Sequence, residues 1–220
     1  MDTQIFLLNI KQQLQNPVDR YLKYFSDERV KKILSYRFNS DRNRTLWAEL
    51  LARTIIADMT GKNFTEIKIF RDSDGRPYCS EPGIFFSLSH AGNFVACSAG
   101  DSQNGVDVEI LDRRIDINIA KRFFLTSEYL TLKNLNEDEF RRKFFEYWTL
   151  KESCLKCLCL DEWSHVDCEK LLGGEYEKIQ GKNFYISDAV IGICSEKNKM
   201  PKNFTLCSID CILLKYLNEA

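Results

Sequence analysis

Apolar and polar residues alternate along residues 104–110, "NGVDVEI", and this alternation predicts a β-strand. Its three apolar side chains would share one face of the strand, and Asp107 and Glu109 would share the opposite face. The Cα atoms of the two acids would lie roughly 6.6–6.8 Å apart, which is two steps of strand rise. Two carboxylates this close repel each other unless water or a cation lies between them. The pair therefore indicates either the solvated face of an edge strand or a cation site.

Helical patterns precede this strand. Ser26, followed by two acids, is a typical N-cap and first turn for a helix over residues 29–38. Ser40 and Asp41 predict the start of a longer helix that ends at Gly61, because glycine favours the left-handed conformation that terminates helices. The core-facing stripe of this longer helix is Leu46, Trp47, Leu50, Leu51 and Ile55. The first third of the chain is therefore predicted to be mostly helical.

The pattern then changes to that of strands. Residues 66–70 predict a strand, and residues 72–77 predict a turn with Gly75 at its tightest point. Residues 84–90 and 93–99 predict a hairpin. The strand at 104–110 follows this hairpin.

The second half partly repeats the order of helices followed by strands. Two short helices are predicted, at 118–125 and 127–135. Asn136, followed by three acids, is a typical N-cap for a long helix that runs to about residue 158. Two late strands are predicted, at 183–194 and 203–214.

This repeated order predicts an α+β fold with two similar halves. The segment "GKNF" occurs at 61–64 and again at 181–184, each time before a predicted strand. We place the boundary so that the halves are residues 1–103 and 104–220. No linker rich in proline or glycine separates them, so we expect the halves to share an interface.

Composition narrows the function classes. The 220 residues carry a net charge of −1 and 44% hydrophobic residues, which is typical of a soluble globular protein and gives no argument for nucleic-acid or membrane binding. No apolar run approaches the roughly 18 residues of a membrane span, and the start of the chain lacks the features of a secretory signal. We therefore expect a cytoplasmic protein whose nine cysteines are reduced.

One group of residues has the composition of a zinc site: Cys154, Cys157, Cys159, His165 and Cys168. Structural zinc sites are commonly built from two C-x-x-C pairs, and no second pair follows here. The first cysteines also fall inside the predicted long helix. Both observations disfavour structural zinc.

The long helix contains a second acidic position. In "FFEYWTLKESCLKCL", residues 144–158, Glu152 and Lys156 lie four residues apart on one helix face. Taken alone, they would form a surface ion pair worth a few tenths of a kcal/mol. Together with Asp107 and Glu109, however, Glu152 would complete three oxygen ligands suited to Mg²⁺ or Mn²⁺. A lysine one turn away would then suit an anionic group held beside that metal.

These two segments resemble a known family. "GVDVEI" and "WTLKESCLK" are similar to the two signature segments of 4′-phosphopantetheinyl transferases, in the larger pseudo-dimeric group typified by the surfactin-synthetase activator. Asp107 and Glu152 are 45 positions apart, which also fits the spacing between the family's two signature segments. "DGRPY", "FSLSHAG" and "IAKRFFLTSEY" resemble further family elements, with Arg76 where a lysine is usual. The resemblance covers roughly residues 25 to 160.

The resemblance implies an activity and a set of roles. The family transfers the 4′-phosphopantetheine of coenzyme A to a serine of an apo acyl or peptidyl carrier protein and releases 3′,5′-ADP. It implies a pseudo-two-fold fold with the active site between the halves. Asp107, Glu109 and Glu152 would be the metal ligands, Glu152 the base for the serine hydroxyl and Lys156 the cation on the transferring phosphate, with Asp107 catalytic as well.

Coenzyme A must be bound without a glycine-rich phosphate loop, because neither G-x-x-x-x-G-K nor G-x-G-x-x-G occurs in the chain. Side-chain cations would have to bind the phosphates instead. The resemblance places these residues on coenzyme A, mainly at its ADP end: Arg29, Lys32, Arg44, Thr45, Arg76, Ser89, His90 and Lys156. We assign this function to the N-terminal half, and the metal site and catalytic helix to the C-terminal half.

The carrier protein would be acidic around its target serine. The stretch "DRRIDINIAKRFF", residues 112–124, mixes arginines and lysine with apolar residues, which suits such a partner. We expect Phe123 and Phe124, by contrast, to lie in the core. We expect the protein to act as a monomer on fatty-acid, polyketide or nonribosomal-peptide carriers, without a preference among these pathways.

Two other functions use similar residues. A Mg²⁺-dependent nuclease would need a lysine two positions after Glu109, where the chain has Leu111, and a positive charge that the chain lacks. A relative that binds carrier proteins without catalysis is the other alternative. The intact set of acids disfavours it.

Overall fold

The computed structural model describes residues 1–160, 166–186 and 188–212. The strands are β1 (Gln4–Asn9), β2 (Ile69–Arg71), β3 (Pro77–Cys79), β4 (Phe85–Ala91), β5 (Phe94–Gly100), β6 (Asn104–Ile110), β7 (Ile179–Ile186), β8 (Ala189–Glu196) and β9 (Thr205–Cys207). The α-helices are α1 (Asp19–Leu22), α2 (Asp27–Ser35), α3 (Asn39–Thr60), α4 (Ile117–Phe123), α5 (Thr126–Lys133), α6 (Glu137–Leu158), α7 (Cys168–Gly173) and α8 (Ile209–Ile212). Short 3₁₀ turns are η1 (Lys11–Gln13), η2 (Phe64–Glu66) and η4 (Lys197–Lys199).

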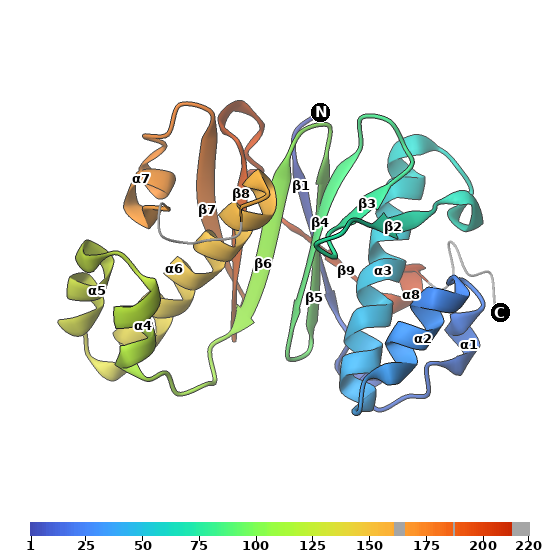
Figure 1. The fold of residues 1–220 in the computed structure, drawn as a ribbon, viewed down its shortest axis with the longest axis horizontal. Coiled ribbons are helices and arrows are strands. Elements are labelled where there is room, and N and C mark those ends of the chain that lie inside the picture. Colours follow the sequence, from blue (N-terminus) through green and yellow to red (C-terminus); the bar gives the residue numbers. More distant parts are fainter. Residues whose placement is uncertain (161–165, 187, 213–220) are drawn as a thin grey trace.

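The strands form two main sheets at the centre of the molecule, with α3 and α6 on opposite sides of them (Figure 1). The first sheet has the order β4-β5-β1-β9 and the second has the order β6-β8-β7. In the first sheet, β9 runs parallel to β1 and the other pairs are antiparallel. The mixture of helices and strands confirms the α+β class. The pseudo-two-fold axis and the boundary at residue 103 remain predictions.

One face of each sheet packs against the other sheet. Ile5 and Leu7 of β1 belong to the same buried cluster as Val106 and Val108 of β6 and Ile191 of β8. The opposite face of the first sheet packs against α3, whose predicted stripe is buried. The opposite face of the second sheet packs against α6. Because alternate side chains point to opposite faces, Asp107 and Glu109 lie on the α6 face of β6.

Strands β4 and β6 connect the two sheets without a shared backbone ladder. Two serine hydroxyls of β4 accept hydrogen bonds from β6 instead: the Val106 amide bonds to Ser87 Oγ at 3.2 Å, and the Val108 amide bonds to Ser89 Oγ at 3.3 Å. These bonds satisfy amides that would otherwise be buried without partners. They also fix β4 beside the acidic strand.

The helix predictions hold at most of their ends. Ser26 caps α2, its side chain accepting from the Arg29 amide, and Asn136 caps α6. Gly61 ends α3 with φ of 71°. The start of α3 is Asn39, with Phe38 at the N-cap, so the predicted start at Ser40 is late by one residue. The predicted short helices correspond to α4 and α5.

Three strand predictions were wrong in extent. The strand predicted at 66–70 is a 3₁₀ turn followed by β2, Ile69–Arg71. The strand predicted at 183–194 is a hairpin of two strands, β7 and β8, which pair antiparallel. Of the region 203–214, the described residues 203–212 form the short strand β9 and the helix α8. The sequence prediction also missed β1, which lies inside the first sheet.

Candidate active site

Asp107 lies where β4, β6 and α6 meet. It is 6% exposed and accepts two hydrogen bonds at one oxygen: Ser89 Oγ donates to Oδ1 at 2.7 Å, and Lys156 Nζ donates to the same atom at 2.8 Å. Lys156 also donates to the Val106 carbonyl at 3.0 Å. The structure therefore brings together three residues that the sequence analysis assigned to the site from three separate segments.

Glu109 lies two residues further along the same face of β6. Arg113 Nη2 donates to its Oε2 at 2.7 Å. Burial and the negative charge of Asp107 raise the pKa of Glu109 to about 7, although Arg113 and Lys156 oppose that rise. The buried carboxylate of Asp107 and the half-buried carboxylate of Glu109 thus lie next to each other, and each already contacts a basic side chain.

Two glycines set the distance between the acidic strand and α6. A Cβ at Gly105 would lie 2.0 Å from the Ser153 carbonyl oxygen, and a Cβ at Gly192 would lie 2.5 Å from the Thr149 carbonyl. Gly192 is the cross-strand partner of Asp107 in β8. The backbone of α6 therefore packs directly on the backbone of β6 and β8. This close approach lets Lys156 of α6 reach Asp107.

Glu152 lies on α6 between Thr149 and Ser153, the residues whose carbonyls approach the two glycines. It is one turn before Lys156, and its side chain is partly exposed. The neighbouring Lys151 has a different position. It is fully buried, and its Nζ lies 2.9 Å from Glu128 Oε2 of α5, which is 1% exposed. The Lys151 ammonium also donates to the Val166 carbonyl, and the Cys168 amide donates to Glu128 Oε1 at 2.9 Å. Lys151 and Glu128 are therefore a satisfied buried ion pair, whereas the adjacent Glu152 is partly exposed.

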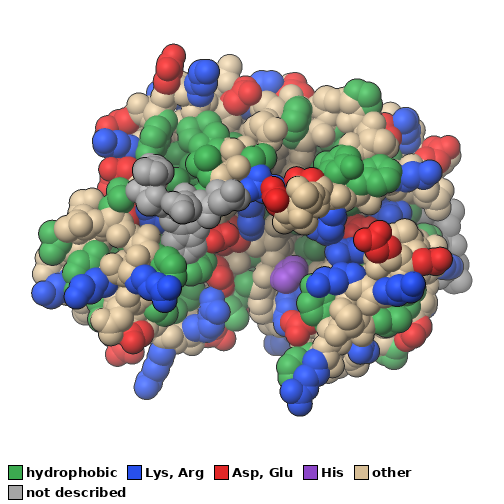
Figure 2. All heavy atoms as spheres, in the orientation of Figure 1, with side chains coloured by type: hydrophobic (Ala, Val, Ile, Leu, Met, Phe, Trp, Pro, Cys, Tyr) green, Lys and Arg blue, Asp and Glu red, His purple; other side chains and the backbone are tan. Residues whose placement is uncertain are grey.

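His90, at the end of β4, is exposed, and this face of the molecule has a hollow with a histidine side chain in it (Figure 2). The surrounding protein, followed by the positive charges of Arg44 and Lys156, lowers the pKa of His90. Arg44 donates to the Gly92 carbonyl at 3.0 Å and to Asp41 Oδ1 at 2.6 Å. The β4–β5 turn therefore holds Arg44 near His90, so these two predicted coenzyme A residues share one region.

The other residues predicted to bind coenzyme A are spread along the N-terminal half. Arg29 Nε bonds to Glu49 Oε2 at 2.7 Å, and Lys32 lies over the Tyr36 ring. Thr45 is buried in α3, 6% exposed. Arg76, on the β2–β3 hairpin, donates to the Leu160 carbonyl at 3.3 Å, just after α6.

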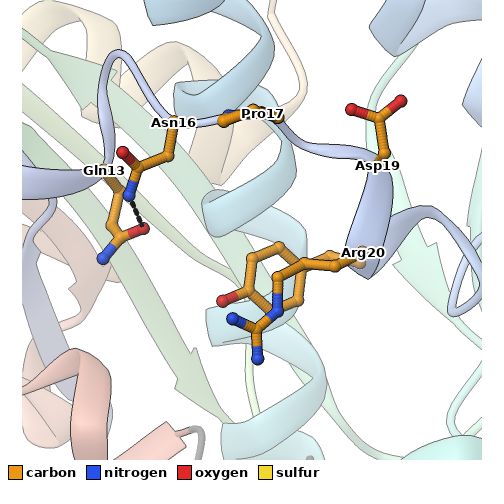
Figure 3. A pocket seen from close by; sticks show the side chains of 6 residues that line it. Gln13, Asn16, Pro17, Asp19 and Arg20 are labelled. Carbon is orange, nitrogen blue, oxygen red and sulfur yellow. Dashed lines mark hydrogen bonds between the residues drawn. The ribbon is translucent and has the colours of Figure 1, made fainter.

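Two cavities lie away from these residues. One, of about 370 Å³, is lined by Gln13, Asn16, Pro17, Asp19, Arg20 and Tyr21 (Figure 3). The other, of about 290 Å³, is lined by Arg114, Ile115, Glu137, Phe140 and Arg141. No residue that the sequence analysis assigned to catalysis, metal or coenzyme A lines either cavity.

Within the described residues, no group of three histidine, cysteine, aspartate or glutamate side chains is gathered closely enough to hold a metal ion. The donors of Asp107 and Glu109 nevertheless fit Mg²⁺, because they are hard oxygens whose mutual repulsion a cation would remove. The thiols of the candidate zinc group are free cysteines, buried at Cys154, Cys157 and Cys168 and exposed at Cys159. His165 of that group lies outside the described residues.

The prediction for one phenylalanine was wrong, and several partners of the site were not predicted. Phe124 is buried as expected, but Phe123 is 41% exposed. Ser87 was missed because a serine hydroxyl in a strand carries no pattern of its own. Glu49 was missed, although an acid among the apolar residues of α3 is a signal for a buried ion pair.

Comparisons with known proteins find one family along most of the chain. A model of the 4′-phosphopantetheinyl transferase N-terminal domain matches residues 14–102, and a model of the 4′-phosphopantetheinyl transferase superfamily matches residues 103–193. The Bacillus subtilis (strain 168) 4′-phosphopantetheinyl transferase Sfp is 30% identical over 212 residues, which are 90% of this chain and 94% of Sfp. The 4′-phosphopantetheinyl transferase HetI of Nostoc sp. is 32% identical over 137 residues, 60% of this chain and 58% of HetI.

The helices of the described residues include none that is long and apolar enough to cross a membrane. Matches along most of the chain confirm the resemblance that the two acidic segments indicated, and with it the transferase class of the enzyme. The chain belongs to the 4′-phosphopantetheinyl transferase superfamily.

Proposed function

We propose that this chain transfers the 4′-phosphopantetheine of coenzyme A to a serine of an apo carrier protein and releases 3′,5′-ADP. The contact of Ser89 and Lys156 with Asp107 is the observation that carries the proposal. The contact brings together three elements: β4, which carries Ser89 of the predicted coenzyme A site, and β6 and α6, which carry the two acidic segments. A buried aspartate with a lysine and a hydroxyl is a suitable environment for a phosphate and its counter-ion.

Asp107, Glu109 and Glu152 would hold Mg²⁺. When bound, the ion would neutralise charge on the pyrophosphate of coenzyme A. Lys156 would turn from Asp107 to the phosphate that is transferred and stabilise its charge as the bond to the leaving 3′,5′-ADP breaks. Glu152, directly or through a water, would accept the proton of the carrier serine hydroxyl.

The carrier would bind beside α4. Phe123 and Ile119 of α4 are 41% and 36% exposed, and Leu130 of α5 is 51% exposed. Arg122 and Lys121 of α4 lie among them. An apolar surface with a basic rim complements an acidic helix around the target serine. The monomeric state and the cytoplasmic location remain predictions.

The test is to incubate the protein with coenzyme A, Mg²⁺ and an apo carrier protein and to measure the mass of the carrier. We expect the mass to increase by one phosphopantetheine. If the mass of several acyl and peptidyl carriers did not increase, the proposal would be contradicted. If the protein bound those carriers without any increase in their mass, it would be a non-catalytic relative.

Arg113 should compete with the metal for Glu109. Its side chain is 56% exposed, so its ion pair with Glu109 is a weak one. We expect Arg113→Ala to lower the Mg²⁺ concentration for half-maximal transfer at pH 8, roughly two- to fivefold, as an exposed ion pair implies. Arg142→Ala is the control, because Arg142 forms a similar exposed ion pair with Glu146, away from Glu109. An unchanged requirement in Arg113→Ala would contradict the competition.

Glu109 should make the metal-free protein less stable as the pH rises. Its pKa is about 7 in the folded chain and 4.5 as a free side chain. The folded state therefore binds more protons between these pH values, and the free energy of unfolding falls as pH rises through that interval. The loss is at most about 3.5 kcal/mol, since the pKa differs by about 2.5 and one unit of pKa is about 1.4 kcal/mol.

Glu109→Gln removes this titration. In EDTA, we expect the variant to be more stable than wild type at pH 8 and nearly equal to it at pH 4.5, as measured by urea unfolding. The difference between the two proteins isolates Glu109 from other titrating groups. A difference that does not change with pH would show that the carboxylate is not perturbed.

A further inference from the structure

Strands β4 and β6 are joined by three side-chain hydrogen bonds at regular intervals. The Asn104 Nδ2 donates to the Phe85 carbonyl at 3.1 Å. The next two are the bonds from the backbone amides of Val106 and Val108 to serine hydroxyls of β4. In each pair the two residues are 19 positions apart, and successive pairs advance by two residues in both strands. The three bonds therefore form a side-chain ladder along which β4 and β6 run parallel.

The last bond of this side-chain ladder lies in the candidate active site. Ser89 accepts from the Val108 amide and donates to Asp107 Oδ1 at 2.7 Å. The position of β4 along β6 therefore decides whether a residue predicted to bind coenzyme A contacts a predicted metal ligand. A displacement of β4 by one step of the ladder, which is two residues or roughly 6.6 Å, would break this contact.

The two serines of the ladder do not by themselves fix the position of β4. A displacement by two residues keeps every side chain on its own face of the sheet, so burial of apolar residues does not prevent it. It would also place Ser89 opposite Val106, where one serine hydroxyl replaces the other. A further interaction must therefore distinguish the observed register from the displaced one.

Asn104 distinguishes the two registers, because its side chain bonds to three segments at once. Its Nδ2 donates to the Ser102 carbonyl at 2.9 Å as well as to Phe85 of β4, and its Oδ1 accepts from Ser98 Oγ of β5 at 2.5 Å. Asn104 is 3% exposed and Ser98 is fully buried, so these bonds replace bonds to water. In the displaced register the Phe85 carbonyl would be out of reach, and a buried N–H donor would lose its partner.

We propose that Asn104 is a positioning residue of the active site, which fixes β4 against β6 and so holds Ser89 on Asp107. The effect on transfer rests on the proposed function, and the residue is one that no motif identified. Asn104 acts through Ser89 and touches neither coenzyme A nor a metal. Its loss should weaken metal binding and slow transfer, and it should leave the KM for the carrier unchanged.

The first test measures hydrogen exchange of single backbone amides by NMR in EDTA, so it needs neither activity nor metal. Val106 and Val108 bond through their amides to β4. Successive amides of a strand point to opposite edges, so those of Asp107 and Glu109 point toward β8. In Asn104→Ala, we expect the first two amides to exchange about tenfold faster relative to the other two, as loss of one hydrogen bond implies. A loss of global stability would speed exchange of all four alike.

The second test measures the Mg²⁺ concentration for half-maximal transfer. We expect Asn104→Ala to raise this concentration roughly tenfold, because loss of a group that supports a metal ligand from outside costs about that much affinity. A variant that was only less stable would transfer at a rate reduced in proportion to its folded fraction, and its Mg²⁺ requirement would equal that of wild type.

Asn43→Ala is the matched control. This buried asparagine of α3 is 1% exposed, and its Nδ2 donates to the carbonyls of Leu14, Asn16 and Asn39, all outside β4 and β6. Its loss removes a similar set of hydrogen bonds. We expect it to lower the temperature of thermal unfolding and to change neither the exchange ratio nor the Mg²⁺ requirement.

Ser98→Ala is a milder variant, since it removes only the bond to Asn104 Oδ1. It should shift both measurements in the same direction by a smaller factor, and it decides the inference if Asn104→Ala does not fold. An unchanged exchange ratio in the folded variant would overturn the inference, and so would an unchanged Mg²⁺ requirement, even with normal transfer by wild type. A wild type that transfers nothing would contradict the proposed function, and the exchange ratio would then decide alone whether Asn104 fixes β4.

Discussion

Replacing Asp107 with alanine should remove most transfer activity, lowering kcat/KM by about a hundred- to a thousandfold, the effect of removing a charge-stabilising group from an active site. The side chain accepts from both Ser89 and Lys156, so its loss leaves Lys156 without its counter-charge and the proposed metal without a ligand. Excess Mg²⁺ should restore little activity, because the variant lacks a ligand rather than having a weaker one. The measurement is the initial rate of carrier modification against Mg²⁺ concentration.

Asp138→Ala is the control for this variant. Asp138 lies in the first turn of α6 with its side chain 91% exposed, so its loss should leave transfer unchanged. Normal turnover by Asp107→Ala would contradict its roles in catalysis and in metal binding together.

Replacing Gly105 with alanine should remove both stability and activity. The new Cβ would lie 2.0 Å from the Ser153 carbonyl oxygen and 2.6 Å from the Cys157 amide nitrogen, and both are backbone atoms that cannot rotate away. The helix α6 must therefore move off β6, which separates Lys156 from Asp107. We expect a loss of roughly 3 kcal/mol in the free energy of unfolding, as overpacked cores show, and loss of transfer in the fraction that remains folded.

Gly173→Ala is the matched control, since its Cβ would lie 3.5 Å from the nearest atom, at ordinary contact distance. Urea unfolding and the transfer rate are measured for both variants. If Gly105→Ala were as stable and active as Gly173→Ala, the close packing of α6 on β6 would not be what positions Lys156.

The parts of the fold that the sequence predicts well are those with a local signal. The helix α6 has an N-cap at Asn136 and acids in its first turn, and its predicted end at residue 158 is correct. The strand β6 alternates strictly, because one face packs in the core between the sheets and the other faces α6. Both acidic segments lie in these two elements, which is why the pairing of β6 with α6 could be anticipated.

The missed strand β1 has no such signal. Its central residues, "IFLL", form a continuous apolar run because Ile5 and Leu7 face the second sheet while Leu8 faces α3. A strand buried on both faces does not alternate. The hairpin of β7 and β8 was merged into one strand because neither glycine nor proline marks the turn between them. For β1, the deciding information is which other element covers each face.

The candidate site shows the same limit. The sequence could assign Asp107, Glu109, Glu152 and Lys156, because motifs carry them. It could not show that Lys156 bonds to Asp107, nor that Arg113 bonds to Glu109, because these contacts depend on helix packing and on a loop conformation. The ion pair between Arg29 of α2 and Glu49 of α3 depends on how these two helices pack, and no short motif encodes it.

The most direct test of the account is a crystal structure with 3′,5′-ADP and Mn²⁺, in which anomalous scattering locates the metal. We expect one anomalous peak in contact with carboxylate oxygens of Asp107, Glu109 and Glu152, with Lys156 displaced from Asp107 toward the nucleotide. A structure with the nucleotide bound but no peak between these three acids, or with Lys156 still bonded to Asp107, would contradict the proposal that the strand β6 and the helix α6 form one metal-dependent active site.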